Sequence, residues 1–153
     1  MLYILEYGLN GAFETSPEYG EEFMKKNTLE TNQEDKIQNL KDTLDKVNMF
    51  YNKLSECFNI KYPLSKEIYG VESRNYKVQI PILMIISDFL KKIMEIGIDI
   101  NDLNEIQKII KVISSVMKDS YLENNFKGSS TRPELLIETS KNLFDKYNEI
   151  NRI

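Results

Sequence analysis

The side chains that could do chemistry in this chain are carboxylates, lysines, hydroxyls and one thiol, because the sequence contains no histidine. Without histidine there is no imidazole to act as general base for a serine or cysteine nucleophile, and no histidine ligand for haem or for a di-iron site. Zinc would need several thiolates, and Cys57 is the single cysteine. The sequence therefore predicts no metal, no cofactor and no enzymatic activity.

Two local patterns resemble reactive or metal sites but have simpler interpretations. Cys57 lies beside an apolar stripe, which favours a buried small side chain over a reactive thiol. Asp99, Asn101 and Glu105 are spaced like the acceptors of a calcium loop, but the segment lacks the loop glycine and is too short. We expect Asn101 or Asp102 to cap a helix there instead.

A basic stretch leads into the last expected helix and forms a candidate anion site. Backbone N–H groups at the start of a helix attract anions, and Lys127, Gly128 and Arg132 are the residues placed to assist them. The lysine precedes the glycine, and the first glycine of a nucleotide-binding loop is missing, so the pattern predicts no nucleotide site. An ordinary capped loop is favoured over a functional anion site.

Methionines at expected core positions raise the alternative of a site for an apolar small molecule. Methionine side chains are flexible and adapt to irregular cavities. The candidate residues for such a ligand are Met84, Phe89, Met94 and Met117. Plain filling of the core is the favoured interpretation, although the segment 81–96 has more apolar surface than one helix face requires.

Tyrosines gather where the helical pattern is weakest, in the first 30 residues and between residues 59 and 76. Tyrosine is enriched at protein–protein interfaces because it combines an apolar ring with a polar hydroxyl. The candidate partner-binding residues are Tyr3, Tyr7, Tyr19, Tyr62, Tyr69 and Tyr76. Half-buried packing against the helices explains the same residues equally well.

Long amphipathic helices must position these residues. Apolar side chains recur at steps of three and four, which is the spacing of one helix face. The pattern predicts four principal helices, near residues 32–58, 76–97, 101–124 and 132–151. Short turns favour antiparallel neighbours, so the expected fold is all-α, a single-domain helical bundle over residues 31–153.

The first 30 residues have a different pattern and are expected to form a separate N-terminal arm. Glycines and Pro17 interrupt short apolar runs there, which indicates an irregular or hairpin-like segment. Ser16 before Pro17 has the features of a cap with proline at the first helical position. This predicts a short helix that turns Tyr19, Phe23 and Met24 inward.

The expected core follows from the same spacing. The regular heptad near 32–58 also fits a homodimeric coiled coil, but Phe50 widens the apolar stripe and favours packing within one chain. Pro81 either opens or kinks the second helix, and Gly97 ends it. Burial is predicted for Leu44, Val47, Leu54, Ile82, Ile86, Phe89, Ile93, Ile106, Ile110, Ile113, Leu136 and Leu143.

Composition limits the class of function. The chain has 153 residues, 41% of them hydrophobic, which suits one folded domain. A net charge of -4 disfavours nucleic-acid binding. Charges interrupt the most apolar stretch, 80–96, so we expect no membrane insertion. The single cysteine and the lack of a basic leader favour the cytoplasm.

Binding is therefore the expected function. The leading hypothesis is a small cytoplasmic regulatory or interaction protein, such as an inhibitor, an immunity-type protein or an adaptor, which binds one partner protein. The alternative is a ligand-sensing helical domain that buries a fatty-acid-like molecule, an analogy at the level of fold alone. Native mass spectrometry separates the two, because a bound lipid adds a defined mass.

Overall fold

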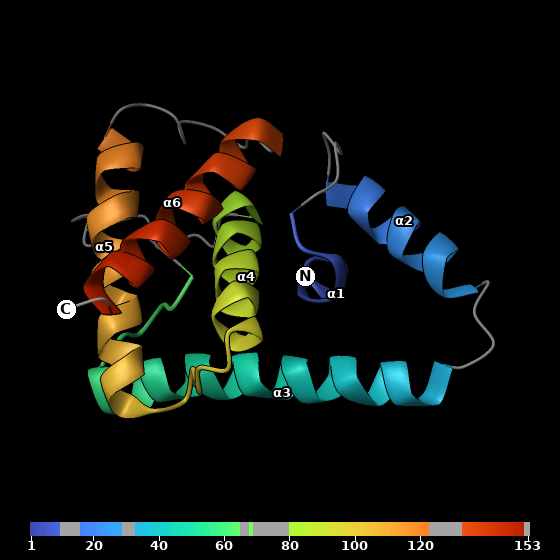
Figure 1. The fold of residues 1–153 in the computed structure, drawn as a ribbon, viewed down its shortest axis with the longest axis horizontal. Helices are drawn as coiled ribbons and strands as arrows, with labels where there is room; N and C mark the ends of the chain where they lie inside the picture. Colours follow the sequence, from blue (N-terminus) through green and yellow to red (C-terminus); the bar gives the residue numbers. More distant parts are fainter. Residues whose placement is uncertain (10–15, 29–32, 65–67, 69–79, 123–132, 152–153) are drawn as a thin grey trace.

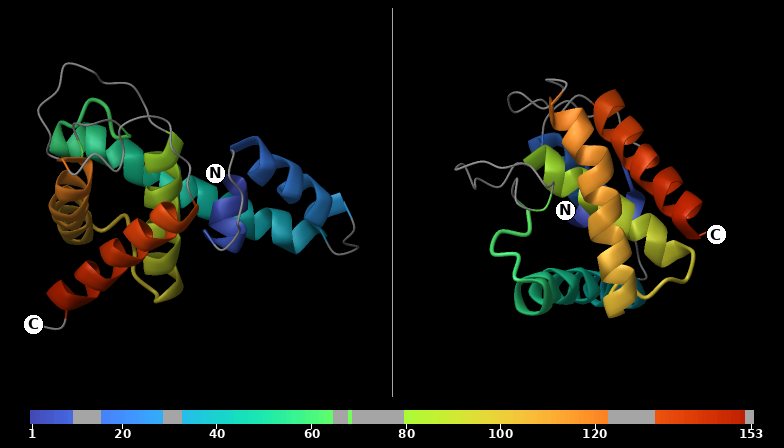
Figure 2. Two further views of the ribbon diagram at one scale, coloured as in Figure 1. Left: turned by 90° about the horizontal axis from the view of Figure 1, so that it is seen from above. Right: turned by 90° about the vertical axis from the view of Figure 1, so that its left-hand side faces the viewer.

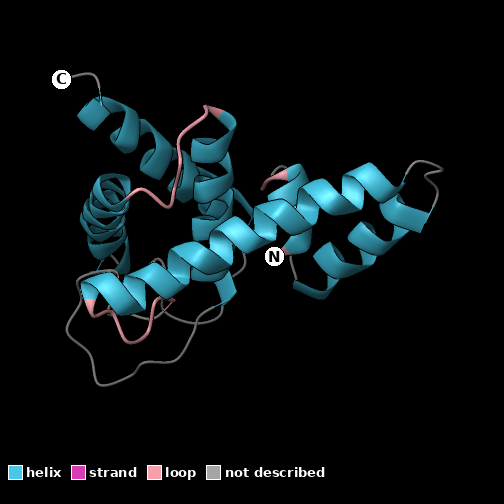
Figure 3. Ribbon diagram, turned by 90° about the horizontal axis from the view of Figure 1, so that it is seen from below, coloured by secondary structure: helices cyan, strands magenta, loops and turns pink. Residues whose placement is uncertain are grey.

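The computed structural model describes residues 1–9, 16–28, 33–64, 68, 80–122 and 133–151. All regular structure in this part of the chain is helical, which confirms the all-α class (Figure 3). The elements are α1 (Leu2–Tyr7), α2 (Ser16–Thr28), α3 (Gln33–Phe58), α4 (Ile80–Glu95), α5 (Leu103–Leu122) and α6 (Pro133–Asn151). The four expected principal helices correspond to α3, α4, α5 and α6.

The described residues of the N-terminal arm, 1–9 and 16–28, are mostly helical, whereas the sequence predicts an irregular or hairpin-like arm with one short helix. The short helix predicted after Ser16 is α2; Tyr19 is buried as expected, but Met24 is 63% exposed. Residues 2–7 form α1, whose Tyr3, Ile4 and Leu5 are buried. A helix of six residues is stabilised by its tertiary contacts, and local sequence signals do not reveal such contacts.

The long helices are not arranged as an up-and-down bundle. In Figure 1, α6 crosses both α4 and α5, with which it makes the most extensive packing, while α3 runs across the lower ends of α4 and α5. The end-on view of α3 in Figure 2 (right) shows the same transverse arrangement. The short helix α1 packs against α2, α3 and α4. The crossing of α3 therefore differs from the expected antiparallel bundle.

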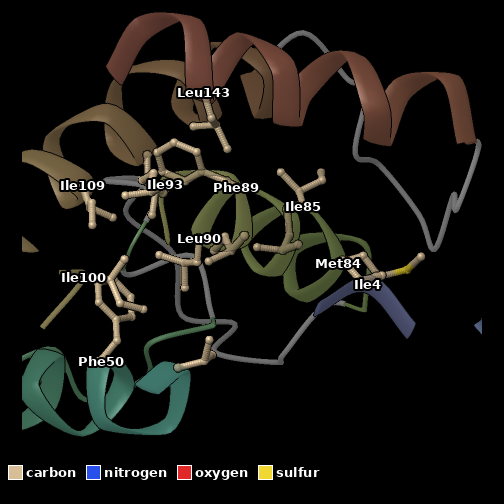
Figure 4. Close-up of a cluster of buried hydrophobic side chains, with 14 of the residues drawn as sticks. Ile4, Phe50, Met84, Ile85, Phe89, Leu90, Ile93, Ile100, Ile109 and Leu143 are labelled. Carbon is tan, nitrogen blue, oxygen red and sulfur yellow. The ribbon is translucent and has the colours of Figure 1, made fainter. Parts of the chain in front are cut away.

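The core forms around α4, whose apolar character on nearly all sides was visible in the sequence. Side chains from α1, α3, α5 and α6 converge on it (Figure 4). Of the twelve positions predicted to be buried, ten are buried, whereas Leu44 and Ile110 are half-buried. On α5 the buried face is centred on Ile109 and Ile113, which turns Ile110 to its edge.

The ends of α4 and α5 follow the expected chemistry. Gly97 adopts a φ of 83° just after α4, a conformation that favours glycine, and its N–H donates to the Met94 carbonyl at 3.0 Å. Asp102 caps α5, because its Oδ1 accepts the N–H groups of Asn104 at 2.9 Å and Glu105 at 3.1 Å. Helix capping, rather than a calcium loop, is thus the role of this turn.

The prediction for Cys57 was wrong, because this residue is exposed. Cys57 lies in the last turn of α3, beyond Leu54, which is the last buried residue of the helix. The apolar spacing continues past the point where other helices cover it. Separately, none of the described helices combines the length and apolar character needed to cross a membrane.

Candidate functional site

The most unusual group in the interior is Asp88, a carboxylate in the middle of the apolar helix α4 with 1% exposure. Its Oδ1 accepts the backbone N–H of Leu9 at 2.8 Å. Its Oδ2 accepts the Ser140 hydroxyl of α6 at 2.5 Å and forms an ion pair with the Lys92 ammonium at 2.7 Å. We call these residues the Asp88 network. It joins three parts of the chain that are far apart in sequence.

A glycine fits the chain closely against this carboxylate. Gly8 has φ 75° and ψ -178°, a combination that is essentially restricted to glycine. A Cβ at this position would lie 3.1 Å from Asp88 Oδ1. The backbone therefore turns directly over the carboxylate and presents the next N–H group, that of Leu9, to it.

The Asp88 network borders a cleft, but its geometry does not suit nucleophilic catalysis. The cleft has a volume of about 300 Å³ and is lined by Tyr7, Gly8, Leu9, Asp88, Lys91, Lys92 and Glu95. Lys92 also donates to Ser140 Oγ at 3.1 Å. This distance would allow a lysine to act as general base for a serine nucleophile. The Ser140 side chain is 0% exposed and does not line the cleft, so a substrate carbonyl has no access to it in this structure.

A second polar network joins α5 to α6 at the edge of the core. Glu105 accepts the Tyr147 hydroxyl at 2.5 Å and the Lys108 ammonium at 2.6 Å, and Lys108 also donates to Asn151 at 3.2 Å. Burial alone would raise the pKa of Glu105, but the hydrogen bonds from Lys108 and Tyr147 lower it below its ordinary value. Burial, followed by the Glu105 contact, raises the pKa of Tyr147. We call these residues the Glu105 network.

The tyrosines of the candidate partner surface do not share one environment. Tyr3 and Tyr19 are buried, with ring centroids 5.4 Å apart, so they contribute to the core and not to an accessible surface. Tyr7 is half-buried and accepts a hydrogen bond from Lys36. Tyr62 is 36% exposed, with the Lys61 ammonium 5.3 Å from its ring centroid. Tyr69 and Tyr76 lie outside the described residues, as do the anion candidates Lys127, Gly128 and Arg132.

The candidates for an apolar ligand are in or beside the core. Met84, Phe89 and Met117 are buried among other apolar side chains. Met94 is half-buried and lines a cleft of about 360 Å³ with Lys46 and residues 97–100. This cleft is bordered by a lysine and an aspartate, which makes it a poor match for a fatty-acid-like chain.

The apolar stripe of α3 extends beyond the core. Its buried residues, Val47, Phe50 and Leu54, all belong to the second half of the helix. In the first half the same stripe continues through Leu40 and Leu44, which are half-buried, to Ile37, which is 60% exposed. This half extends past the body formed by α4, α5 and α6, with α1 and α2 on its side (Figure 2, left).

Sequence reasoning missed both Asp88 and the surplus apolar surface. Asp88 and Lys92 have the i, i+4 spacing of a helical ion pair, which was a usable signal, but Ser140 lies 52 residues from Asp88 and nothing local connects them. The exposure of Ile37 depends on where the other helices end. No cluster of acidic or cysteine side chains suited to a metal ion occurs among the described residues.

Comparison of the sequence with known protein families and with curated proteins, and of the fold with solved structures, finds no match. Function is therefore inferred from the geometry of this chain.

Proposed function

We propose that this chain is a small regulatory or interaction protein that acts by binding a partner protein, and that the first half of α3 forms the centre of the binding surface. The observation that carries the proposal is the continuation of the α3 apolar stripe beyond the core, up to the 60% exposed Ile37. Ile37 continues the half-buried Leu40 and Leu44 into one apolar strip, and contiguous apolar surface is typical of sites that another protein covers.

The helix that precedes α3 in the chain supplies a second exposed apolar side chain for this proposal. On α2, Met24 is 63% exposed, the largest exposure among the exposed large apolar side chains of the described residues. Methionine is common at binding surfaces because its flexible side chain adapts to a partner. The proposal relies less on the tyrosines than the sequence suggested, since Tyr3 and Tyr19 are buried.

A binding role also agrees with the chemistry of the interior. The one lysine and serine pair described above has no access to a substrate, and the carboxylates of the two polar networks are occupied by partners from the same chain. We assign the protein no catalytic role. The single, exposed cysteine suits a reducing compartment, which supports action in the cytoplasm.

The test compares affinity capture of partner proteins by the wild-type protein and by the double variant Met24→Gln, Ile37→Gln. A few central side chains usually contribute most of the binding energy of an interface. We therefore expect the double variant to capture about tenfold less of the partner protein that the wild-type protein captures. Its thermal midpoint should stay within a few degrees of wild type, because both side chains are exposed. Quantitative mass spectrometry of the captured proteins gives the first readout and circular dichroism the second.

The matched control is Ile137→Gln, the same type of change at a 38% exposed position on α6. It should leave partner capture unchanged. A partner captured equally by wild type and by both variants would show that the binding surface lies elsewhere. Tyr62→Ser would then test the tyrosines between residues 59 and 76. If wild type reproducibly enriches no protein, or if native mass spectrometry shows a bound lipid, the proposed function is wrong.

A further inference from the structure

The short helix α1 owes its order to its contacts with the rest of the molecule. It has six residues and no side-chain hydrogen bond at its first turn. Helices of this length do not persist alone in water. Tyr3, Ile4, Leu5 and Leu9 are all buried, and α1 packs against α2, α3 and α4. In Figure 4, Ile4 of α1 lies next to Met84 of α4.

Lys36 of α3 holds α1 through an ion pair with Glu6 at 2.7 Å and a hydrogen bond to the Tyr7 hydroxyl at 2.9 Å, at a partly exposed position where water can replace either contact. A further polar contact lies in the interior, the hydrogen bond from Leu9 N–H to Asp88 Oδ1. The two oxygens of Asp88 have separate partners: Oδ1 faces the end of α1, and Oδ2 binds Lys92 and Ser140 within α4 and α6. If α1 left its position, Oδ2 would keep both partners, and Oδ1, beside an existing cleft, would become accessible to water. The charge would not be left unpaired in the interior.

We propose that α1 detaches reversibly from α3 and α4, and that the contact of Gly8 and Leu9 with Asp88 Oδ1 keeps it docked. We call this the Gly8–Asp88 contact. Release exposes the apolar side chains of α1 and the surface beneath it while α3, α4, α5 and α6 stay folded. The Gly8–Asp88 contact should be weakened by any substitution of Gly8. A side chain there meets Asp88 Oδ1, and the backbone conformation is essentially restricted to glycine. This conformational change does not depend on the proposed function.

The first test is amide hydrogen exchange of the full chain, followed by NMR. The reporters for α1 are the N–H groups of Gly8 and Leu9, which bond to Ile4 and to Asp88, and the reference is the N–H groups of Phe89 and Ile93 in α4. We expect the α1 reporters to exchange together and at least about a hundredfold faster than the reference, since local openings need less free energy than global unfolding. Equal protection of the two sets would show that α1 is an inseparable part of the fold, and would overturn the proposal.

The second test is Gly8→Ala. It disturbs the Gly8–Asp88 contact at the end of α1 and leaves the side chains of Asp88, Lys92 and Ser140 unchanged. The strained backbone and the close approach should speed exchange of the Leu9 amide roughly tenfold or more, with the chemical shifts of α4 and α6 retained. The control is Gly20→Ala in α2, where an added Cβ meets nothing within 4 Å. An unchanged Leu9 rate in Gly8→Ala, or loss of the native α4 shifts in that variant, would each overturn the proposal.

Discussion

Two carboxylates of this protein connect α6 to a neighbouring helix, and they do so in different surroundings. Asp88 joins α6 to α4 in the interior, with 1% exposure, whereas Glu105 joins α6 to α5 at the edge of the core, with an 18% exposed side chain. Each carboxylate accepts a hydrogen bond from a hydroxyl group and contacts a lysine ammonium. Asp88 also accepts the Leu9 N–H, whereas the contacts of Glu105 lie where water can replace a missing partner.

The difference concerns what remains after a partner is removed. A donor left unpaired in the interior loses its hydrogen bond to water as well as to the protein. At the edge of the core, a side chain that loses its partner turns toward solvent at little cost. We therefore expect the Asp88 network to be much less tolerant of substitution than the Glu105 network.

The largest effect should come from Asp88→Ala. This change leaves the Leu9 N–H, the Ser140 hydroxyl and the Lys92 ammonium without their common acceptor. Lys92 is 31% exposed and can turn to water, so the loss comes mainly from the buried Leu9 N–H and Ser140 hydroxyl. A buried polar group left unsatisfied costs about 1–3 kcal/mol, so the free energy of unfolding should fall by about 2 kcal/mol or more. Urea unfolding followed by circular dichroism measures this change.

The matched control for this experiment is Glu138→Ala, which removes an exposed carboxylate from α6. Its effect should be within about 0.5 kcal/mol of zero. If the two alanine variants were equally stable, the Asp88 network would not stabilise the fold. The proposal that the Gly8–Asp88 contact keeps α1 docked would then fail as well.

A smaller effect is expected for Tyr147→Phe in the second network. The ring, which is buried and lies with its centroid 6.1 Å from that of Phe89, is retained, and only the hydroxyl that donates to Glu105 is lost. Glu105 keeps Lys108 as a partner, so the variant should lose about 1.5 kcal/mol, the lower end for a hydrogen bond to a charged group. The same urea titration checks it. A loss as large as that of Asp88→Ala would contradict the contrast between the two networks.

The comparison also shows what could be predicted from the sequence. Helices α3, α4, α5 and α6 were predictable, because their spacing of three and four is a local property. Helix α1 was not, since six residues carry too little local signal and its order comes from α3 and α4. The transverse position of α3 was also out of reach, because an apolar stripe shows which face is buried and not the angle at which another helix crosses it.

The candidate sites were harder to predict for the same reason. In the sequence Asp88 is one of several charges that interrupt an apolar stretch, although a carboxylate there with a lysine four residues later can indicate a buried pair. The partner Ser140 comes from a distant helix. Conversely, the sequence makes Tyr3 and Tyr19 candidates for a binding surface, with packing against the helices as an equal alternative and an inward-facing position also expected for Tyr19, and tertiary packing buries both. Local patterns give the elements, while burial depends on which elements meet.

The smallest effect of the series concerns pH and the Glu105 carboxylate. Its pKa is lowered in the folded protein from its ordinary value of 4.5, because the hydrogen bonds from Lys108 and Tyr147 outweigh burial. A group with a lowered folded pKa stabilises the fold above its ordinary pKa, and this contribution disappears as the pH falls through the folded pKa. In Glu105→Gln the side chain at this position has no titratable carboxyl group. The free energy of unfolding of the wild-type protein at pH 7 should therefore exceed that of the variant, by about 1 kcal/mol or less because solvent screens the charge at the edge of the core. Thermal unfolding at pH 7, 4 and 3 should show this difference shrinking toward the acid end. A difference that stayed constant over this range, or grew as the pH fell, would show that the value of Glu105 to the fold does not come from its charge.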